Sequence, residues 1–419
     1  MRPPFVLTVL ACTSLLSSNL ALAQFSQQGA KLVGAGAIGN AFQGQSVSIS
    51  GDGNTAIVGG SGDDSGTGAV WIWTRNGASW TEQSAKLVGS GAVGKAQQGF
   101  SASISADGNT ALVGGRADNS GTGGAWVWTR AGNVWTQQTK LVGTGAVGAA
   151  QQGKSVCLSA DGNTAIVGGW TDDGQAGAAW VWTRSGDVWT QQGNKLVGSD
   201  AAGTAEQGTS VSLSADGNTA MVGGQNDNGF RGAAWVWMRS GSVWTQQGLK
   251  LVGSGSALGP GQGSSVSLSA DGNTAIVGGL GDNGSVGAVW VWIRNGGIWT
   301  QQGDKLVGSG SLGTAEQGWS VSLSADGNTA IVSGFTDHSG TGAIWVWSRS
   351  GGVWTQQGSK LVGLGAIGKA FLGSSVSLSA DGKTAIAGGN QDNTNAGAAW
   401  VFTAPTNTVA PQRRRAVLH

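Results

Sequence analysis

The chain has 419 residues, of which 78 are glycine and 21 are tryptophan, and it contains no tyrosine. Only 11% of the residues are charged, and the formal net charge is +1. Interspersed charges of balanced sign give no electrostatic basis for binding nucleic acid or an anionic membrane, so neither is expected as a partner.

The N-terminal segment 1–23 has the features of a signal peptide. It has a short positive start, the apolar stretch "FVLTVLACTSLL", and the small residues Ala21 and Ala23 before Gln24. A transmembrane anchor is disfavoured because the apolar run is short and interrupted by polar residues. Lipidation at Cys12 is a weaker alternative. Cleavage after Ala23 predicts an exported chain that is secreted, periplasmic or on the cell surface, with no membrane insertion of the mature protein.

A fifteen-residue motif, seen as "SVSLSADGNTAIVGG" at 265–279, recurs in near copies along the whole chain. Successive copies begin 54 or 55 residues apart, a period typical of repeat architectures. The copies start at Ser46, Ser101, Ser155, Ser210, Ser265, Ser320 and Ser375.

Each repeat predicts four short strands. In the unit 305–358 they are "SVSLS" (320–324), "NTAIVSG" (328–334), "AIWVWSR" (343–349) and the segment 353–362. The Asp-Gly turn after the first strand and the Ser-Gly-Gly turn after the third are typical of hairpins. Glycine and serine interrupt every apolar run, so no helix is expected. Seven such units predict an all-β fold, a seven-bladed β-propeller with four antiparallel strands per blade.

The two ends of the repeat region complement one another. The segment 25–34, "FSQQGAKLVG", matches the end of a repeat, whereas the last repeat stops at "AAWVFT" (398–403) without its fourth strand. The N-terminal strand is therefore predicted to complete the last blade and close the ring, which removes two exposed strand edges. The predicted domain covers 24–403, followed by a disordered tail over 404–419.

The segments "FQGQSVSISGDGNTAIVGG" (42–60) and "FLGSSVSLSADGKTAIAGG" (371–389) resemble the FG-GAP repeat of the integrin α propeller and of bacterial exported proteins. The resemblance covers nearly all of 25–403 and implies a seven-bladed propeller, extracellular placement, and adhesion to protein or carbohydrate. The Phe-Gly of that family is mostly Gln-Gly here, as at Gln98-Gly99.

Calcium-binding members of that family carry several carboxylates between their first two strands. The equivalent turn here has one, such as Asp107, whereas calcium needs six to eight oxygen ligands. A local bond to the turn backbone is the expected role of these aspartates. No calcium and no other cofactor is expected.

A second aspartate series lies in the longer loop after the second strand. These residues either cap their own loop or bind a cation or a sugar hydroxyl. A repeated lysine series balances the charge blade by blade. The aspartate series is Asp63, Asp118, Asp172, Asp227, Asp282, Asp337 and Asp392.

Tryptophan pairs occupy the third strand of six repeats, as at Trp126 and Trp128. Their two indoles share one strand face. Packing between blades is the favoured interpretation, and presentation to the rings of a sugar is the alternative.

Positions that differ between copies indicate a binding face better than positions that repeat. If both long connections leave the same end of the ring, large side chains from several blades rim one face there, and large aromatics and arginine are the usual anchors of a binding patch. Neutral variation of loops is the alternative. The candidate face consists of Arg116, Trp170, Phe230, Arg231, Trp319 and Phe335.

Catalysis has few candidate groups. The sequence contains three glutamates, one histidine within the repeats and no cluster with metal-ligand spacing. The prediction is a monomeric, non-enzymatic propeller that binds an extracellular or surface protein through one face. The alternatives are a multivalent lectin and a structural envelope or matrix protein; the number of ligands bound per chain would distinguish the lectin.

Overall fold

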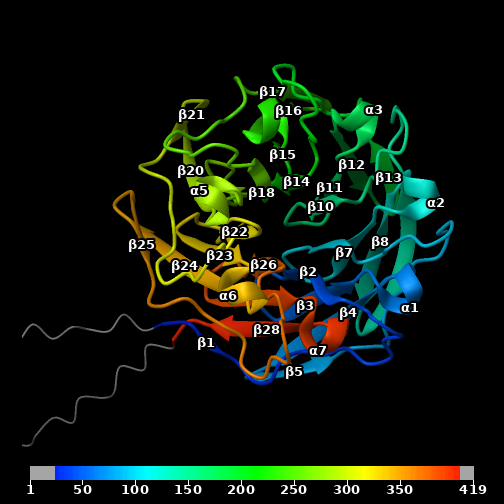
Figure 1. Cartoon of the computed structure of the whole chain (residues 1–419). Coiled ribbons are helices and arrows are strands. Elements are labelled where there is room, and N and C mark those ends of the chain that lie inside the picture. The colour runs from blue at the N-terminus through cyan, green and yellow to red at the C-terminus, as the bar shows by residue number, and fades with distance from the viewer. Residues whose placement is uncertain (1–23, 406–419) are drawn as a thin grey trace, which may run out of the picture.

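The computed structural model describes residues 24–405. The predicted signal peptide (1–23) and residues 406–419 of the predicted tail lie outside the described residues. Seven four-stranded antiparallel sheets surround a common axis, as Figure 1 shows. The seven-bladed propeller predicted from the repeats is confirmed.

The sheets are described as blades 1 to 7 in chain order. In each blade the first strand named is innermost. Blade 1 is β2 (Gln43–Ile49), β3 (Thr55–Gly60), β4 (Ala69–Asn76) and β5 (Ser79–Glu82); blade 2 is β6 (Ser101–Ile104), β7 (Thr110–Gly115), β8 (Gly124–Ala131) and β9 (Val134–Leu141); blade 3 is β10 (Ser155–Leu158), β11 (Thr164–Gly169), β12 (Ala178–Ser185) and β13 (Val188–Gln191). Blade 4 is β14 (Ser210–Leu213), β15 (Thr219–Gly224), β16 (Ala233–Ser240) and β17 (Val243–Gln246); blade 5 is β18 (Gln262–Leu268), β19 (Thr274–Gly279), β20 (Ala288–Asn295) and β21 (Ile298–Gln301). Blade 6 is β22 (Val321–Leu323), β23 (Thr329–Gly334), β24 (Ala343–Ser350) and β25 (Val353–Gln356); blade 7 is β26 (Ser375–Leu378), β27 (Thr384–Gly389), β28 (Ala398–Thr403) and β1 (Ser26–Gln27).

The Asp-Gly turn between the first two strands is held by its own side chains. In blade 2 the hydroxyl of Ser105 donates to the Asp107 carboxylate, which also accepts the backbone N–H of Asn109 at 2.9 Å. Gly108 adopts φ +70°, a conformation that the turn requires and glycine tolerates. Burial alone would raise the pKa of Asp107, but these hydrogen bonds outweigh it and lower the pKa. The predicted structural role of the turn aspartate is confirmed.

The core lies between adjacent blades. Trp71 of β4 is fully buried, and Trp73 is 8% exposed; both belong to a cluster with Ile386 and Val401 of blade 7. The corresponding tryptophans of the other blades are buried in the same way. Inter-blade packing is therefore the role of the tryptophan pairs, and their rings are not available to a sugar.

The chain termini close the ring. β1 pairs with β28 through Ser26 opposite Thr403 and Gln27 opposite Phe402, and Figure 1 shows the two strands side by side. The isolated bridge of Leu32 with Ala399 extends this pairing. The innermost strands contact one another in a complete circle, from β2 through β6, β10, β14, β18 and β22 to β26 and back to β2. The predicted closure by the N-terminal strand is confirmed.

Deleting residues 24–33 should open the ring. The deletion removes the buried side chains of Phe25 and Leu32 and leaves the carboxylate of Asp392 without its lysine partner. We expect the free energy of unfolding to fall by at least about 5 kcal/mol in chemical denaturation. Deletion of 406–419 is the matched control and should leave the free energy unchanged. Equal stability of the two truncated proteins would contradict closure by this strand.

Candidate binding face

Two long connections per blade meet at one end of the ring. One follows the second strand, and the other leads into the next blade. Seven short turns lie in the first kind of connection and are drawn as helices in Figure 1. They are α1 (Asp63–Gly66), α2 (Asp118–Gly121), α3 (Asp172–Gln175), α4 (Asp227–Phe230), α5 (Asp282–Ser285), α6 (Asp337–Gly340) and α7 (Asp392–Asn395).

These turns are left-handed at their centre. In α1, Asp64 and Ser65 have φ of 48° and 57°, and the other six turns show the same conformation. The N–H of Asp64 donates to the carbonyl of Ile38, which lies in the connection that enters blade 1. Consecutive left-handed residues are unfavourable for most side chains, so tertiary contacts hold them in place. The sequence predicts no helix. The seven elements α1 to α7 are single turns with left-handed central residues, so none of them is a regular α-helix.

The loop aspartates begin these turns and are ion-paired. Asp227 is 1% exposed; its Oδ2 lies 2.6 Å from Nζ of Lys250, and its Oδ1 accepts the backbone N–H of Ala202 at 2.7 Å. Each carboxylate thus ties the turn to both neighbouring connections. Equivalent pairs with lysines 31, 86, 140, 195, 305 and 360 hold Asp392, Asp63, Asp118, Asp172, Asp282 and Asp337. These contacts use both carboxylate oxygens within the fold, so the geometry favours the loop-capping alternative over ligand binding.

A central cavity of about 470 Å³ opens on this face. Residues from all seven innermost strands line it, chiefly serines and valines. In each blade the residue just before the first serine of the fifteen-residue motif faces the mouth of the cavity, and so do three residues that follow second strands. These mouth residues are Gln45, Phe100, Lys154, Thr209, Ser264, Trp319 and Ser374 from the first group and Trp170, Gln225 and Leu280 from the second.

Blades 2 and 3 contribute a cationic cluster to the mouth. The guanidinium carbon of Arg116 lies 3.9 Å from the ring centre of Phe100. Nζ of Lys154 lies 5.1 Å from the same ring and 4.9 Å from the ring of Trp170. Burial, together with the charge of Arg116, lowers the pKa of Lys154 to about 8, against an opposing effect of Glu206.

Blades 6 and 7 contribute an aromatic cluster. The rings of Trp319 and Phe335 lie 4.0 Å apart, and the ring of Phe371 lies 5.8 Å from that of Phe335. The indole N–H of Trp319 donates to the carbonyl of Ser374 at 3.0 Å, and its side chain remains 37% exposed. The cluster is therefore held in place while part of it faces solvent.

The structure brings together four of the six predicted anchors. Arg116, Trp170, Trp319 and Phe335 lie at or beside the cavity mouth. Phe230 instead packs against the connection that enters blade 5, close to Gly261, and Arg231 is exposed beside it. Both residues lie farther along their connection, outside the cavity lining. They do not belong to the same patch.

Three residues of the cationic and aromatic clusters are missing from the predicted anchors. Phe100 and Lys154 occupy the same position of the repeat as Trp319, which is a signal visible in the sequence. Phe371 is detected only in three dimensions, because it reaches Phe335 of the preceding blade.

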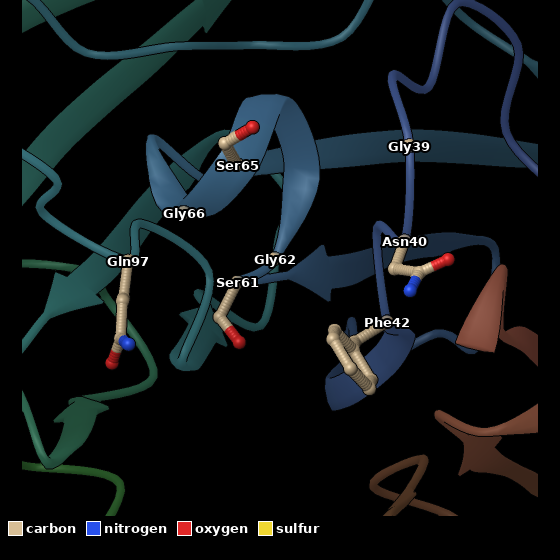
Figure 2. Close-up of a pocket in the computed structure, with 8 residues that line it drawn as sticks. All are labelled: Gly39, Asn40, Phe42, Ser61, Gly62, Ser65, Gly66 and Gln97. Carbon is tan, nitrogen blue, oxygen red and sulfur yellow. The ribbon is translucent and has the colours of Figure 1, made fainter.

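Smaller pockets lie between neighbouring blades on the same face. Figure 2 shows one of about 430 Å³, with Phe42, Ser61 and Ser65 of blade 1 and Gln97 from the connection into blade 2. A second, of about 440 Å³, repeats this arrangement one blade further, between Gln97 and Gln151. These pockets occupy equivalent places in the repeat but differ in lining, because Arg116 and Trp170 line the second one.

Other reactive groups are not gathered at the face. Burial raises the pKa of the Cys157 thiol to about 11, consistent with a structural residue. Within residues 24–405 no three His, Cys, Asp or Glu side chains cluster as metal ligands would. No helix in this range has the length and apolar character needed to cross a membrane.

Comparison of the chain with protein-family models and with curated proteins finds no match. The fold therefore defines the class of protein, which is a seven-bladed β-propeller whose blade-specific side chains meet at one mouth of its channel.

Substitution of Lys250 by methionine tests the buried ion pairs. Lys250→Met leaves the Asp227 carboxylate buried without a cation, and we expect the free energy of unfolding to fall by about 3 kcal/mol in urea titration. Adding Asp227→Asn should recover part of the loss. The exposed Lys369→Met is the control and should have little effect. A Lys250→Met protein as stable as wild type would contradict a stabilising role of the pair.

Substitution of Lys154 tests the cost of placing a cation at the mouth. The pKa of Lys154 in the folded state is about 8, below the ordinary value of 10.5, so the charged form destabilises the fold at neutral pH. Lys154→Met should raise the free energy of unfolding at pH 7 by on the order of 1–3 kcal/mol. Between about pH 8 and pH 10.5 the folded protein binds fewer protons than the unfolded chain. The wild type therefore gains stability relative to the variant as pH rises. A pH-independent difference in denaturation midpoints would contradict this.

Proposed function

We propose that this protein is an exported, non-enzymatic binding propeller that engages a protein partner through the loops around the cavity mouth. One observation carries the proposal: large side chains that differ between blades gather at this mouth, whereas the repeated residues are used in packing. One asymmetric patch suits one bound copy of a partner. Arg116, Trp170, Trp319 and Phe335 are its anchors, since arginine and large aromatics dominate binding energy at interfaces.

The sequence motifs support the export and adhesion part of the proposal. Seven copies similar to the FG-GAP repeat favour membership of that family and an extracellular adhesive role. The predicted signal peptide favours export. The loop carboxylates are engaged by lysines, which supports binding without calcium.

A second candidate function is a multivalent lectin. The observation in its favour is the recurrence of a pocket between neighbouring blades, as in Figure 2. Repeated pockets would bind several copies of one sugar along the ring.

Two binding screens with the mature protein, residues 24–419, test the two candidates. One is a displayed peptide and surface-protein library, and the other is a glycan array with calcium and again with chelator. We expect a protein ligand that binds once per chain, with no effect of chelator. Trp319→Ala should weaken it by about thirtyfold or more, because loss of a central aromatic anchor costs about 2 kcal/mol or more. Val134→Ala is the control; Val134 is an exposed apolar residue that begins β9, beside the turn at the opposite end of the strands.

Different outcomes would overturn the proposal. Binding of one sugar at several sites per chain, unaffected by Trp319→Ala, would establish the lectin. Loss of binding in chelator would contradict the expected independence from calcium.

A further inference from the structure

The cationic cluster differs from every other lysine and arginine that the repeat produces. The repeated lysines are paired with buried aspartates, and the repeated arginines, such as Arg130, donate to Asn109 and stack on Trp135. Within residues 24–405, neither Arg116 nor Lys154 takes part in an ion pair. Nε of Arg116 donates to the side-chain oxygen of Gln97 at 3.1 Å. This is the one hydrogen bond that the guanidinium makes within residues 24–405.

The cluster concentrates positive charge without neutralising it. Both cations face the ring of Phe100, at 3.9 Å and 5.1 Å. Cation–aromatic contacts stabilise such an arrangement only partly and leave the repulsion between the cations in place. The charges that act on Lys154 are Arg116 and Glu206, and Glu206 also accepts a hydrogen bond from Gln225 at 3.0 Å. An arrangement that costs stability at a cavity mouth is typical of a binding site.

We propose that Arg116 and Lys154, with Phe100 and Trp170 as walls, form a subsite for a carboxylate, and that its occupant is an aspartate or glutamate side chain of the partner. The inference rests on the proposed use of the mouth as the binding site. A guanidinium matches the planar carboxylate through its N–H groups, and the ammonium adds a second donor.

The local charge selects a monoanion. Arg116, Lys154 and Glu206 together carry a net charge of +1 when all three are ionised. One carboxylate neutralises this charge, whereas a doubly charged phosphate would leave an excess negative charge in a partly buried place. The aromatic cluster of Trp319, Phe335 and Phe371 at another part of the mouth favours a carboxylate that is accompanied by an apolar group.

Charge disfavours the basic segment near the end of the chain as the occupant. Residues 413–415 are three arginines, which a cationic subsite repels. A carboxylate from another molecule is thus the occupant that the charges favour.

A matched pair of small probes tests the subsite without a known partner. The probes are 4-fluorophenylacetate and its neutral amide, followed by fluorine NMR and calorimetry on the mature protein. We expect the acid to bind at one site per chain and the amide to bind at least tenfold more weakly. Lys154→Met and Arg116→Gln should each weaken acid binding on the order of tenfold, while Lys154→Arg should retain most of it.

Controls separate the subsite from general charge. Lys95→Met removes an exposed lysine of the same face, and Arg231→Gln an exposed arginine; neither should change the affinity more than twofold. Thermal denaturation identifies any variant that fails to fold. For wild type the affinity should fall as pH rises from 7 to 9.5, because Lys154 loses its proton, and for Lys154→Met it should stay weak and nearly constant.

Equal binding of acid and amide, no binding of either, or acid binding unaffected by both substitutions at the cluster would overturn the assignment. A capped peptide with glutamate beside phenylalanine, its glutamine counterpart, and glucuronate identify the source of the carboxylate. Preference for the glutamate peptide supports the proposal, and preference for glucuronate would assign the subsite to an acidic sugar instead. Probe binding without any protein partner in the library screen would leave the subsite established and the proposed function refuted.

Discussion

The fit of one indole between glycines is the contact on which each blade depends. The ring of Trp71 occupies the space where a side chain at Gly34 or Gly60 would lie; a Cβ built on Gly34 would stand 2.1 Å from the indole. The indole N–H donates to the carbonyl of Ala35 at 2.8 Å, which satisfies its one polar atom. Because this contact recurs in every blade, a fold with many tryptophans must also have many glycines. The unusual composition follows from the packing.

This repeated contact also determines where the sequence is free to vary. Positions that face the neighbouring blade are limited to the residues that fit, such as the glycines around each indole. Positions at the cavity mouth face an open space instead. Arg116, Lys154, Trp170 and Trp319 lie at or beside this mouth among serines and valines of the innermost strands, and they differ from one blade to the next. The repeated packing therefore leaves only the mouth positions free to differ between blades, and the face becomes asymmetric there.

The fold could be predicted almost entirely from the sequence, because the period, the turns and the permuted fourth strand each constrain it independently. The aspartate–lysine pairs could also be predicted from the sequence, because the two residue series keep a nearly constant spacing, as from Asp63 to Lys86. The composition of the mouth could not be derived in the same way. Phe100 belongs to one repeat and Lys154 to the next, and only the curvature of the ring brings these two side chains into contact. The sequence predicts Phe230 as part of the same patch because it lies in the same kind of loop as Arg116 and Trp170. It lies too far along that loop to reach the cavity mouth.

The two clusters make the mouth directional. Cations lie on blades 2 and 3, whereas Trp319, Phe335 and Phe371 lie on blades 6 and 7. A ligand that carries both a carboxylate and an apolar group can satisfy both clusters in one orientation only, whereas a ligand rotated by one blade would lose both. A ring of near-identical blades can thus hold a single partner in a fixed orientation. Seven similar blades cannot distinguish one rotation of a ligand about the ring axis from another. Selection of one orientation would therefore depend on the few mouth positions that packing leaves free to differ.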